Sequence, residues 1–307
     1  MTARLSVAQS REHGAARDDF ADIPPDWPNR AASRVVESGG THWHLQRMGA
    51  GRGLLLLHGT AASTHTWRDL MPMLARDFDV VAIDLPGHGF SERLQGGAMT
   101  LPAIAAALAE LLHTIDFEPQ VVAGHSAGAA VALRMSLDAS IRPTHIVGIN
   151  AALLPFGGAM RRLFSPMARM FASTRLMPQM LAKRARDPKA VARIINGTGS
   201  RIDERGVELY QRLLMRESHI AAVLTMMAGW DLDPLIADLP RLEPRLALIT
   251  GQLDKAVSPR EADTIAEVVP DASVIRLADC GHLAHEEQPQ RVFDNIVRFT
   301  ETDRNDV

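Results

Sequence analysis

The pentapeptide GHSAG at residues 124–128 constrains the fold of this chain more than any other stretch. It follows the apolar run 120–123 and precedes the small apolar residues 129–133, which is the order of a buried strand, a tight turn and a buried helix. A serine between two glycines in that setting is typical of a nucleophile elbow, a turn that pushes one hydroxyl out above a sheet. A glycine turn capped by a serine would give the same five letters. Because both the strand and the helix are present, we predict the elbow, with Ser126 as its hydroxyl.

Length, apolar content and net charge narrow the class of protein. A chain of 307 residues with 46% hydrophobic residues can build one large α/β domain with an insertion, or two modest domains. The formal net charge of -3 argues against broad electrostatic attraction to nucleic acid. We therefore expect no nucleic acid as a partner.

Cysteine content and hydropathy indicate the compartment. Cys280 is the only cysteine, so no disulfide can form within the chain. The first ten residues lack the apolar core of a signal peptide, and no stretch approaches the roughly 20 apolar residues of a membrane-spanning helix. We expect a cytoplasmic protein, with peripheral attachment at the inner membrane as an alternative.

Short apolar runs recur along the chain and predict strands. Most of them are continuously apolar, which is typical of parallel strands buried on both faces, and the intervening segments suit crossover helices. The predicted strands are 34–37, 41–47, 54–57, 80–83, 120–123, 145–149, 246–250 and 273–277. We predict an α/β fold with a mostly parallel eight-stranded sheet flanked by helices.

Residues 151–238 depart from this alternation of strands and helices, because they contain amphipathic helical segments and no convincing strand. We predict that they form an inserted helical cap. The core would then consist of residues 31–150 and 239–307. Residues 1–30 are polar and lack periodicity, and we expect them to form an N-terminal arm.

The first half of the predicted cap combines cations with methionines. Its only acid is Asp187. The cations are Arg161, Arg162, Arg169, Arg175, Lys183, Arg184, Arg186, Lys189 and Arg193, and the methionines are Met160, Met167, Met170, Met177 and Met180. In one interpretation the methionines pack the cap onto the core while the cations are solvated. In the other, an apolar pocket or a membrane-facing surface has a rim of positive charge.

The serine hydroxyl needs a base within hydrogen-bond reach, and the base needs an acid to orient it. Asp254 follows the strand 246–250 and His282 follows the last strand, so both lie at the carboxyl edge of the sheet with Ser126. The order Ser, Asp, His is the order found with nucleophile elbows. We predict Ser126, Asp254 and His282 as the catalytic residues. The rival base is His285, three residues on, and the preceding strand ends in Asn150, which offers no carboxylate.

Acyl transfer also requires donors aimed at the developing oxyanion. The backbone N–H of Ala127, next to the nucleophile, is one candidate. The second is the N–H of Thr60 in the loop HGTA (58–61), where Gly59 lets the chain turn after the strand 54–57. We predict an oxyanion hole formed by Thr60 and Ala127.

Two motifs resemble cofactor or metal sites and do not fit them. The glycines in GAGRG (49–53) precede a strand instead of joining a strand to a helix, so they do not form a dinucleotide fingerprint. The Asp and His of DLPGHG (84–89) have no further ligands at suitable spacing. We expect neither a cofactor nor a metal.

Five motifs in chain order make residues 35–300 resemble the α/β-hydrolase fold enzymes that carry a helical cap. The motifs are HG (58–59), DLPGHGFS (84–91), GHSAG (124–128), GQLD (251–254) and GH (281–282). The chain more closely resembles the magnesium-chelatase-associated α/β-hydrolases encoded with bacteriochlorophyll biosynthesis genes in phototrophic bacteria. That resemblance rests on DWPNR (26–30), WHLQ (43–46), HGTAASTHTW (58–67) and AGWDL (228–232).

The closer resemblance implies a role near the insertion of magnesium into protoporphyrin IX, but it does not imply a chemical step. The wider superfamily includes esterases, perhydrolases, dehalogenases and carbon–carbon bond hydrolases, and Ser126 counts against a dehalogenase, which would carry aspartate at the elbow. Two hypotheses follow. One is a serine hydrolase that acts on an ester or related acyl bond of a small hydrophobic or tetrapyrrole-related substrate. The other is a non-catalytic accessory or porphyrin-binding protein of magnesium chelatase, with the chelatase subunits as partners.

Overall fold

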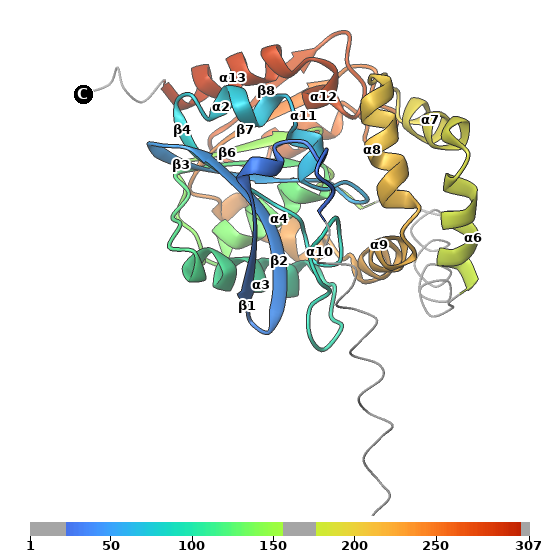
Figure 1. Ribbon diagram of the computed structural model, residues 1–307. Coiled ribbons are helices and arrows are strands. Elements are labelled where there is room, and N and C mark those ends of the chain that lie inside the picture. The colour runs from blue at the N-terminus through green and yellow to red at the C-terminus, as the bar shows by residue number, and fades with distance from the viewer. Residues whose placement is uncertain (1–22, 156–175, 302–307) are drawn as a thin grey trace, which may run out of the picture.

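An eight-stranded sheet forms the centre of the protein (Figure 1). The computed structural model describes residues 23–155 and 176–301. The strand order is β1-β2-β4-β3-β5-β6-β7-β8. The strands are β1 (Ser33–Ser38), β2 (Thr41–Gly49), β3 (Arg52–Leu57), β4 (Phe78–Ile83), β5 (Val121–His125), β6 (His145–Ile149), β7 (Arg245–Gly251) and β8 (Ala272–Leu277). Strand β2 pairs antiparallel with β1 and β4, and all other pairs are parallel. The predicted α/β fold with its mostly parallel sheet is confirmed.

The apolar strands bury side chains on both faces of the sheet. In β3, Leu54 and Leu56 belong to one hydrophobic core, while Leu55 and Leu57 belong to another. Successive side chains of a strand point to opposite faces, so a continuously apolar strand supplies both cores. The run of leucines that marked this strand in the sequence is therefore explained by two-sided burial.

Helices cover each face of the sheet, as Figure 1 shows for α2 and α13 on one side and α3 and α4 on the other. The core helices are α2 (Leu70–Leu74), α3 (Leu101–Thr114), α4 (Ala127–Leu137), α11 (Glu261–Ala266), α12 (Ala284–Glu287) and α13 (Pro289–Glu301), with the 3₁₀ turns η1 (Arg30–Ala32) and η2 (Thr64–Trp67). Thr100 caps α3, where its side chain accepts a hydrogen bond from the N–H of Ala103. The elbow lies at the carboxyl ends of the parallel strands, where α4 begins.

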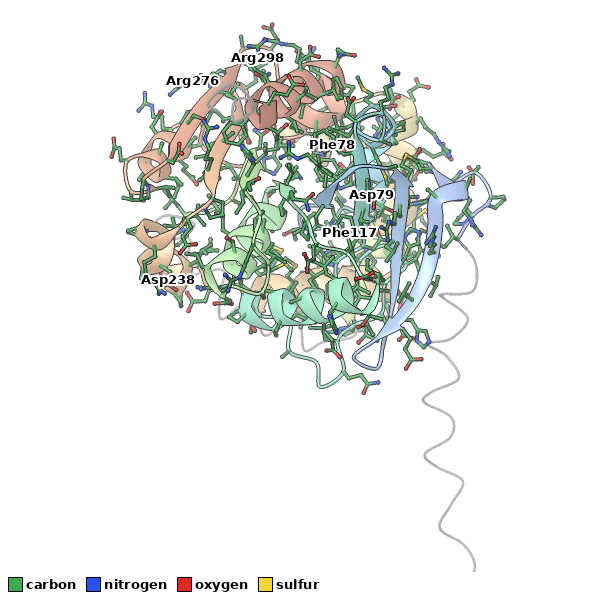
Figure 2. All side chains as sticks on the ribbon, turned by 90° about the vertical axis from the view of Figure 1, so that its left-hand side faces the viewer. Phe78, Asp79, Phe117, Asp238, Arg276 and Arg298 are labelled. Atoms are coloured by element: carbon green, nitrogen blue, oxygen red, sulfur yellow. The ribbon has the colours of Figure 1, made fainter. Side chains whose placement is uncertain are left out.

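The opposite, amino-terminal edge of the sheet is closed by a charged contact (Figure 2). Asp79 at the start of β4 pairs with Arg47 of β2, with 2.6 Å between Nη2 and Oδ2. The same guanidinium lies over the ring of Phe117, 5.3 Å from its centroid. Arg47 thus links β2, the start of β4 and the segment that follows α3.

Within the described part of the segment between β6 and β7, the structure has the helices α6 (Leu176–Ala185), α7 (Pro188–Gly197), α8 (Glu204–Leu214), α9 (Glu217–Gly229) and α10 (Asp233–Asp238), followed by the turn η3 (Leu239–Arg241). No strand occurs in residues 151–155 or 176–238, so the predicted helical insertion is confirmed. Asp238 ties α10 to the core through Nη1 of Arg134 on α4, over 2.8 Å (Figure 2). The exact domain limits stay a prediction. Of the predicted cap residues, Arg161, Arg162, Arg169, Arg175, Met160, Met167 and Met170 lie outside the described residues.

The last residues of the predicted N-terminal arm contact the insertion. Trp27 is buried and packs with Ile23, Phe90, Leu209 and Leu213 in a small core of its own. This contact joins the chain preceding β1 to helix α8. Residues 1–22 lie outside the described part of the chain.

The length and hydropathy of the helices bear on membrane insertion. Within residues 23–155 and 176–301, no single helix is long and apolar enough to cross a bilayer. By length and composition, only the bent pair of α9 with the segment 233–241 passes that test when its two helices are taken together.

Candidate active site

Ser126 occupies a strained turn between β5 and α4, with φ 51° and ψ -116°. A non-glycine residue in such a region costs on the order of 1–3 kcal/mol and persists only where its surroundings hold it. Here the N–H of Ser126 donates to the carbonyl of Ile149 over 3.0 Å, and its carbonyl accepts from the N–H groups of Ala129 and Ala152 over 3.2 Å each. The backbone of Ser126 is therefore held from three sides.

The two glycines of the motif are required by close backbone approach. A Cβ at Gly128 would lie 2.1 Å from the carbonyl oxygen of Leu57, and one at Gly124 would lie 2.5 Å from the nitrogen of Ala129. Both distances are far below van der Waals contact. A side chain at Gly128 would push α4 away from β3, and one at Gly124 would push α4 away from β5, so either would open the turn that carries Ser126.

His282 and Asp254 form a buried hydrogen-bonded pair. Nδ1 of His282 donates to Oδ2 of Asp254 over 2.8 Å, which leaves Nε2 as the free ring nitrogen. The other carboxylate oxygen of Asp254 accepts the backbone N–H groups of Ala256 and Val257 over 2.8 and 2.9 Å. The carboxylate is thus fixed in orientation, and it holds the imidazole in one tautomer.

Asn150 supplies a further donor to this carboxylate. Its Nδ2 donates to Oδ2 of Asp254 over 2.8 Å, from a left-handed backbone conformation with φ 44° directly after β6. The sequence reasoning weighed Asn150 only as an acid and missed this role. The signal available was an asparagine, a residue tolerated in the left-handed region, at the end of the strand beside β7.

The amide oxygen of Asn150 faces a different environment. Oδ1 is buried and has no hydrogen-bond partner within the described part of the chain. Asn150 lines a cavity of about 10 Å³ together with Thr250 and Ser258. That volume is about the size of one water molecule, and most of the other lining residues are apolar, among them Leu248 and Ile265.

His125 connects the elbow to the loop that carries His282. Its Nε2–H donates to the backbone carbonyl of His282 over 2.9 Å, and the two ring centroids lie 4.8 Å apart. Burial, with the nearby rings of His285 and His282, holds the pKa of His125 well below its usual range, so the ring is neutral. From the sequence alone, His125 is expected to be structural or to line the pocket, and its contact with the His282 loop is not foreseen.

The described contacts include no direct hydrogen bond between the hydroxyl of Ser126 and the ring of His282. Such contacts are often long in hydrolases without a bound substrate and tighten when the substrate arrives. The hydrogen bond from His125, one residue before Ser126, to the carbonyl of His282 keeps the elbow and the His282 loop at the same sheet edge.

The two predicted oxyanion donors lie on segments that meet at the elbow. Ala127 is the first residue of α4, where a backbone N–H has no acceptor within the helix. The carbonyl of Gly59 fixes the Thr60 loop, because it accepts Nδ1–H of His58 over 2.8 Å and the N–H of Ala62 over 3.2 Å. A Cβ added to Gly59 would lie 3.0 Å from Cβ of Ser126, so this loop is in direct contact with the elbow.

Asp84 binds the backbone just after the Thr60 loop. Its Oδ1 accepts the N–H of Thr64 over 2.6 Å, and its Oδ2 faces Nδ1 of His44 at 2.7 Å and the N–H of Phe90 at 2.9 Å. Burial alone would raise the pKa of Asp84, but His44 outweighs it and holds the pKa well below its usual range. The Asp of the DLPGHG motif is therefore a structural anion that ties its own loop to strand β2 and to the turn η2.

The rival base His285 makes its hydrogen bond away from the pair of Asp254 and His282. His285 is buried on α12 and its Nε2 bonds Oγ1 of Thr66 over 2.6 Å. Thr66 in turn donates to Oε1 of Glu286, which also accepts the hydroxyl of Tyr210 from α8 over 2.7 Å. This buried cluster joins the core to the insertion and was not foreseen from the sequence. Across residues 23–155 and 176–301, no group of three or more His, Cys, Asp and Glu side chains could hold a metal ion.

Comparisons with known proteins agree with this architecture. Residues 54–295 match the model of the alpha/beta hydrolase family. The magnesium-chelatase 30 kDa subunit of Rhodobacter capsulatus is 36% identical over 266 residues, which cover 86% of this chain and 93% of that protein.

Two solved structures show the same fold at low sequence identity. A thermophilic esterase from Thermogutta terrifontis superposes with a TM-score of 0.69 at 23% identity, covering 87% of this chain and 98% of the esterase. A putative epoxide hydrolase from Pseudomonas aeruginosa gives 0.73 at 22% identity, covering 89% and 96%. With the family model matched over most of the sequence, the chain belongs to the alpha/beta hydrolase family and is a homologue of the magnesium-chelatase 30 kDa subunit.

Proposed function

We propose that this protein is a serine hydrolase that cleaves an ester or related acyl bond. The observation that carries the proposal is the strained backbone of Ser126 at the same sheet edge as the hydrogen-bonded pair of His282 and Asp254. Strain of this kind is retained where a function depends on it. The proposal is also supported by the strand order, because Ser126, Asp254 and His282 follow the carboxyl ends of the parallel strands β5, β7 and β8, and an elbow exposes its hydroxyl at that edge.

In the proposed reaction, Nε2 of His282 takes the proton of the Ser126 hydroxyl as its oxygen attacks the carbonyl carbon. The N–H groups of Thr60 and Ala127 stabilise the oxyanion. Collapse of the intermediate breaks the acyl–oxygen bond, and His282 gives its proton to the departing alcohol. A water molecule then repeats the sequence and releases the acid, while Asp254 stabilises the imidazolium in both steps.

The homology supports a place for this reaction beside the magnesium-chelatase step of bacteriochlorophyll biosynthesis. The relative that carries the name of a magnesium-chelatase subunit aligns over nearly its whole length, so the similarity is not confined to the hydrolase motifs. We propose a small hydrophobic or tetrapyrrole-related acyl compound as substrate and the chelatase subunits as partners. This links the chain to photosynthesis.

A second candidate is a non-catalytic accessory or porphyrin-binding role, and the outer face of the insertion favours it. Leu176, Met180 and Ile194 on α6 and α7 are 70%, 64% and 61% exposed. The same two helices and the turn between them carry exposed cations, among them Lys183 and Lys189. Exposed apolar side chains amid positive charge suit an acidic partner protein or, as peripheral attachment, an anionic membrane.

A fluorophosphonate probe tests the hydrolase proposal directly. The probe should label wild-type protein at Ser126 and leave the Ser126→Ala variant unlabelled. A panel of nitrophenyl esters should be hydrolysed by the wild type, with kcat lowered by about 10⁴ to 10⁶ in Ser126→Ala. Folded wild-type protein that reacts with neither reagent would count against the proposal.

A replacement in the native host separates the two candidates. If turnover is the biological role, the Ser126→Ala strain should lose bacteriochlorophyll as the deletion strain does. Normal pigment in Ser126→Ala with depleted pigment in the deletion strain would favour the accessory role. Membrane attachment requires salt-sensitive binding to anionic liposomes, and absence of binding at low ionic strength would exclude it.

A further inference from the structure

A turn of the helical insertion contacts the loop that carries the predicted acid. Residues 198–201 directly follow α7 in the connection to α8, and we call them the cap turn. Thr198 is the C-cap of α7, and its carbonyl accepts the N–H of Lys255 over 3.0 Å. Lys255 directly follows Asp254. The insertion therefore binds the backbone one residue after the acid.

The same cap turn contacts the loop that carries the predicted base. The hydroxyl of Ser200, which is fully buried, accepts the N–H of Leu283 over 2.8 Å. Leu283 directly follows His282. The carbonyl of His282 is already held by His125 from the elbow, so the peptide group after the base is fixed on both of its polar ends.

Glycines bring the three backbones into contact. Gly199 has φ 87°, and a Cβ there would lie 1.9 Å from the carbonyl oxygen of Leu253 in the acid loop. A Cβ at Gly281, in the base loop, would lie 2.3 Å from the carbonyl carbon of Gly199. No side chain fits between the cap turn and either loop, so a shift of the turn moves both loops.

Glu287 of α12 adds a bridge between the cap turn and the base loop. Its Oε2 accepts the N–H of Arg201 over 3.0 Å, and its Oε1 accepts the N–H of Gly281 over 2.9 Å. One carboxylate therefore holds the last residue of the cap turn and the residue before His282 at a fixed separation.

We propose that the cap turn is a positioning element for catalysis, in which Ser200 sets the place of His282 relative to Ser126. The proposal rests on the hydrolase function proposed above and assigns part of the insertion a role other than covering substrate. Its physical basis is that displacements of about 1 Å in a catalytic group can lower a rate about 100-fold. The cap turn bonds the residues adjacent to both partners of the nucleophile, so it controls displacements of that size.

The test replaces the Ser200 hydroxyl in the full chain. Ser200→Ala leaves the buried N–H of Leu283 without an acceptor, and we expect kcat for a nitrophenyl ester to fall about fivefold to tenfold, as for one lost hydrogen bond. KM should stay within about twofold, because the substituted atom lies in the cap turn against the base loop and not at the substrate. Ser200→Thr keeps the hydroxyl and should restore most of kcat.

A matched control comes from inside the insertion. Gln211 of α8 donates to the carbonyls of Ala185 and Arg186, so Gln211→Ala removes hydrogen bonds within the cap and touches neither catalytic loop. It should lower the melting temperature and leave kcat unchanged. Hydrogen exchange gives a readout that does not depend on activity, because the Leu283 amide should exchange faster in Ser200→Ala and not in Gln211→Ala.

The outcomes separate this inference from the function on which it rests. Wild-type protein without turnover or fluorophosphonate labelling would overturn the hydrolase; faster exchange at Leu283 in Ser200→Ala would then still support the positioning contact. Unchanged kcat and unchanged exchange in Ser200→Ala would overturn the inference. An equal loss of kcat in Ser200→Ala and Gln211→Ala would also overturn it, because the effect would then be one of cap stability.

Discussion

The side-chain amide of Asn150 donates a hydrogen bond to the carboxylate of Asp254 over 2.8 Å, on the same oxygen that faces Nδ1 of His282. Two neighbouring strand ends therefore contribute to one acid. The strand before β7 contributes no second carboxylate there, only a neutral side-chain donor to the first.

Replacing this donor should lower activity more than stability. Asn150→Gly keeps the left-handed backbone and removes the amide, and hydrogen bonds to charged groups are worth about 1.5–3 kcal/mol. We expect kcat/KM for a nitrophenyl ester to fall about 10-fold to 100-fold.

Asn150→Asp is the sharper variant, because it places a second carboxylate beside Asp254. It should lose more activity than Asn150→Gly at neutral pH and recover part of it on acidification, as one of the two carboxyl groups takes a proton. Equal activity of wild type and both variants would show that the contact has no part in catalysis.

Gly59 offers a test of the oxyanion loop. A Cβ there would lie 2.7 Å from Nδ1 of His125 and 3.0 Å from Cβ of Ser126. Gly59→Ala should therefore push the Thr60 loop away from the elbow and lower kcat about 100-fold. Gly197→Ala at the end of α7, where a Cβ meets open space, is the control and should leave kcat unchanged. A fully active Gly59→Ala enzyme would exclude this loop from the reaction.

The sequence predicted those parts of the molecule that local pattern determines. Continuous apolar runs such as 54–57 predicted the buried strands, and the glycines around Ser126 predicted the tight turn there. Each predicted catalytic residue follows a predicted strand. Parallel strands share their carboxyl ends, so Ser126, Asp254 and His282 were predicted to lie at one edge of the sheet. In each case the inference needed only neighbouring residues and the direction of a strand.

The contacts between distant segments could not be predicted in this way. Ser200 and Glu287 are ordinary polar residues in sequence, and their importance comes from which N–H they face after the insertion has folded onto the core. Likewise, nothing next to Tyr210 indicates that its hydroxyl meets the buried carboxylate of Glu286. Tertiary packing determines which residues become partners of this kind, so local periodicity in the sequence cannot predict them.

Buried neutral histidines should make the protein sensitive to acid. Burial lowers the pKa of His65 and of His88 to about 3 in each case, against an ordinary value near 6.5. The others whose pKa burial lowers are His58, His125, His219 and His285. Below pH 6.5 the unfolded chain binds protons that the folded chain does not, so the free energy of unfolding falls as the pH falls from 6.5 towards 3.

This direction gives a stability test. The melting temperature followed by circular dichroism should be lower at pH 5 than at pH 7.5, because the unfolded chain binds the additional protons. His88→Gln removes one group whose folded-state pKa is about 3, so the melting temperature of this variant should fall less between the two pH values than that of the wild type. Equal melting temperatures of the wild type at pH 5 and pH 7.5 would contradict this account.

Cys280 should be inert in the folded protein. It is fully buried, and burial raises the pKa of its thiol to about 11, so almost no thiolate is present at pH 8. Iodoacetamide at pH 8 should alkylate the native protein at below about 1% of the rate seen in guanidinium chloride, as measured by intact mass.

Because the carbonyl of Cys280 accepts the N–H of Leu253 over 2.8 Å, rapid alkylation would require the acid and base loops to separate. Fast labelling of native protein, with parallel loss of ester hydrolysis, would therefore show that these loops open in solution, against the rigid arrangement described above. The Cys280→Ala variant, which cannot be alkylated there, should keep its activity under the same treatment.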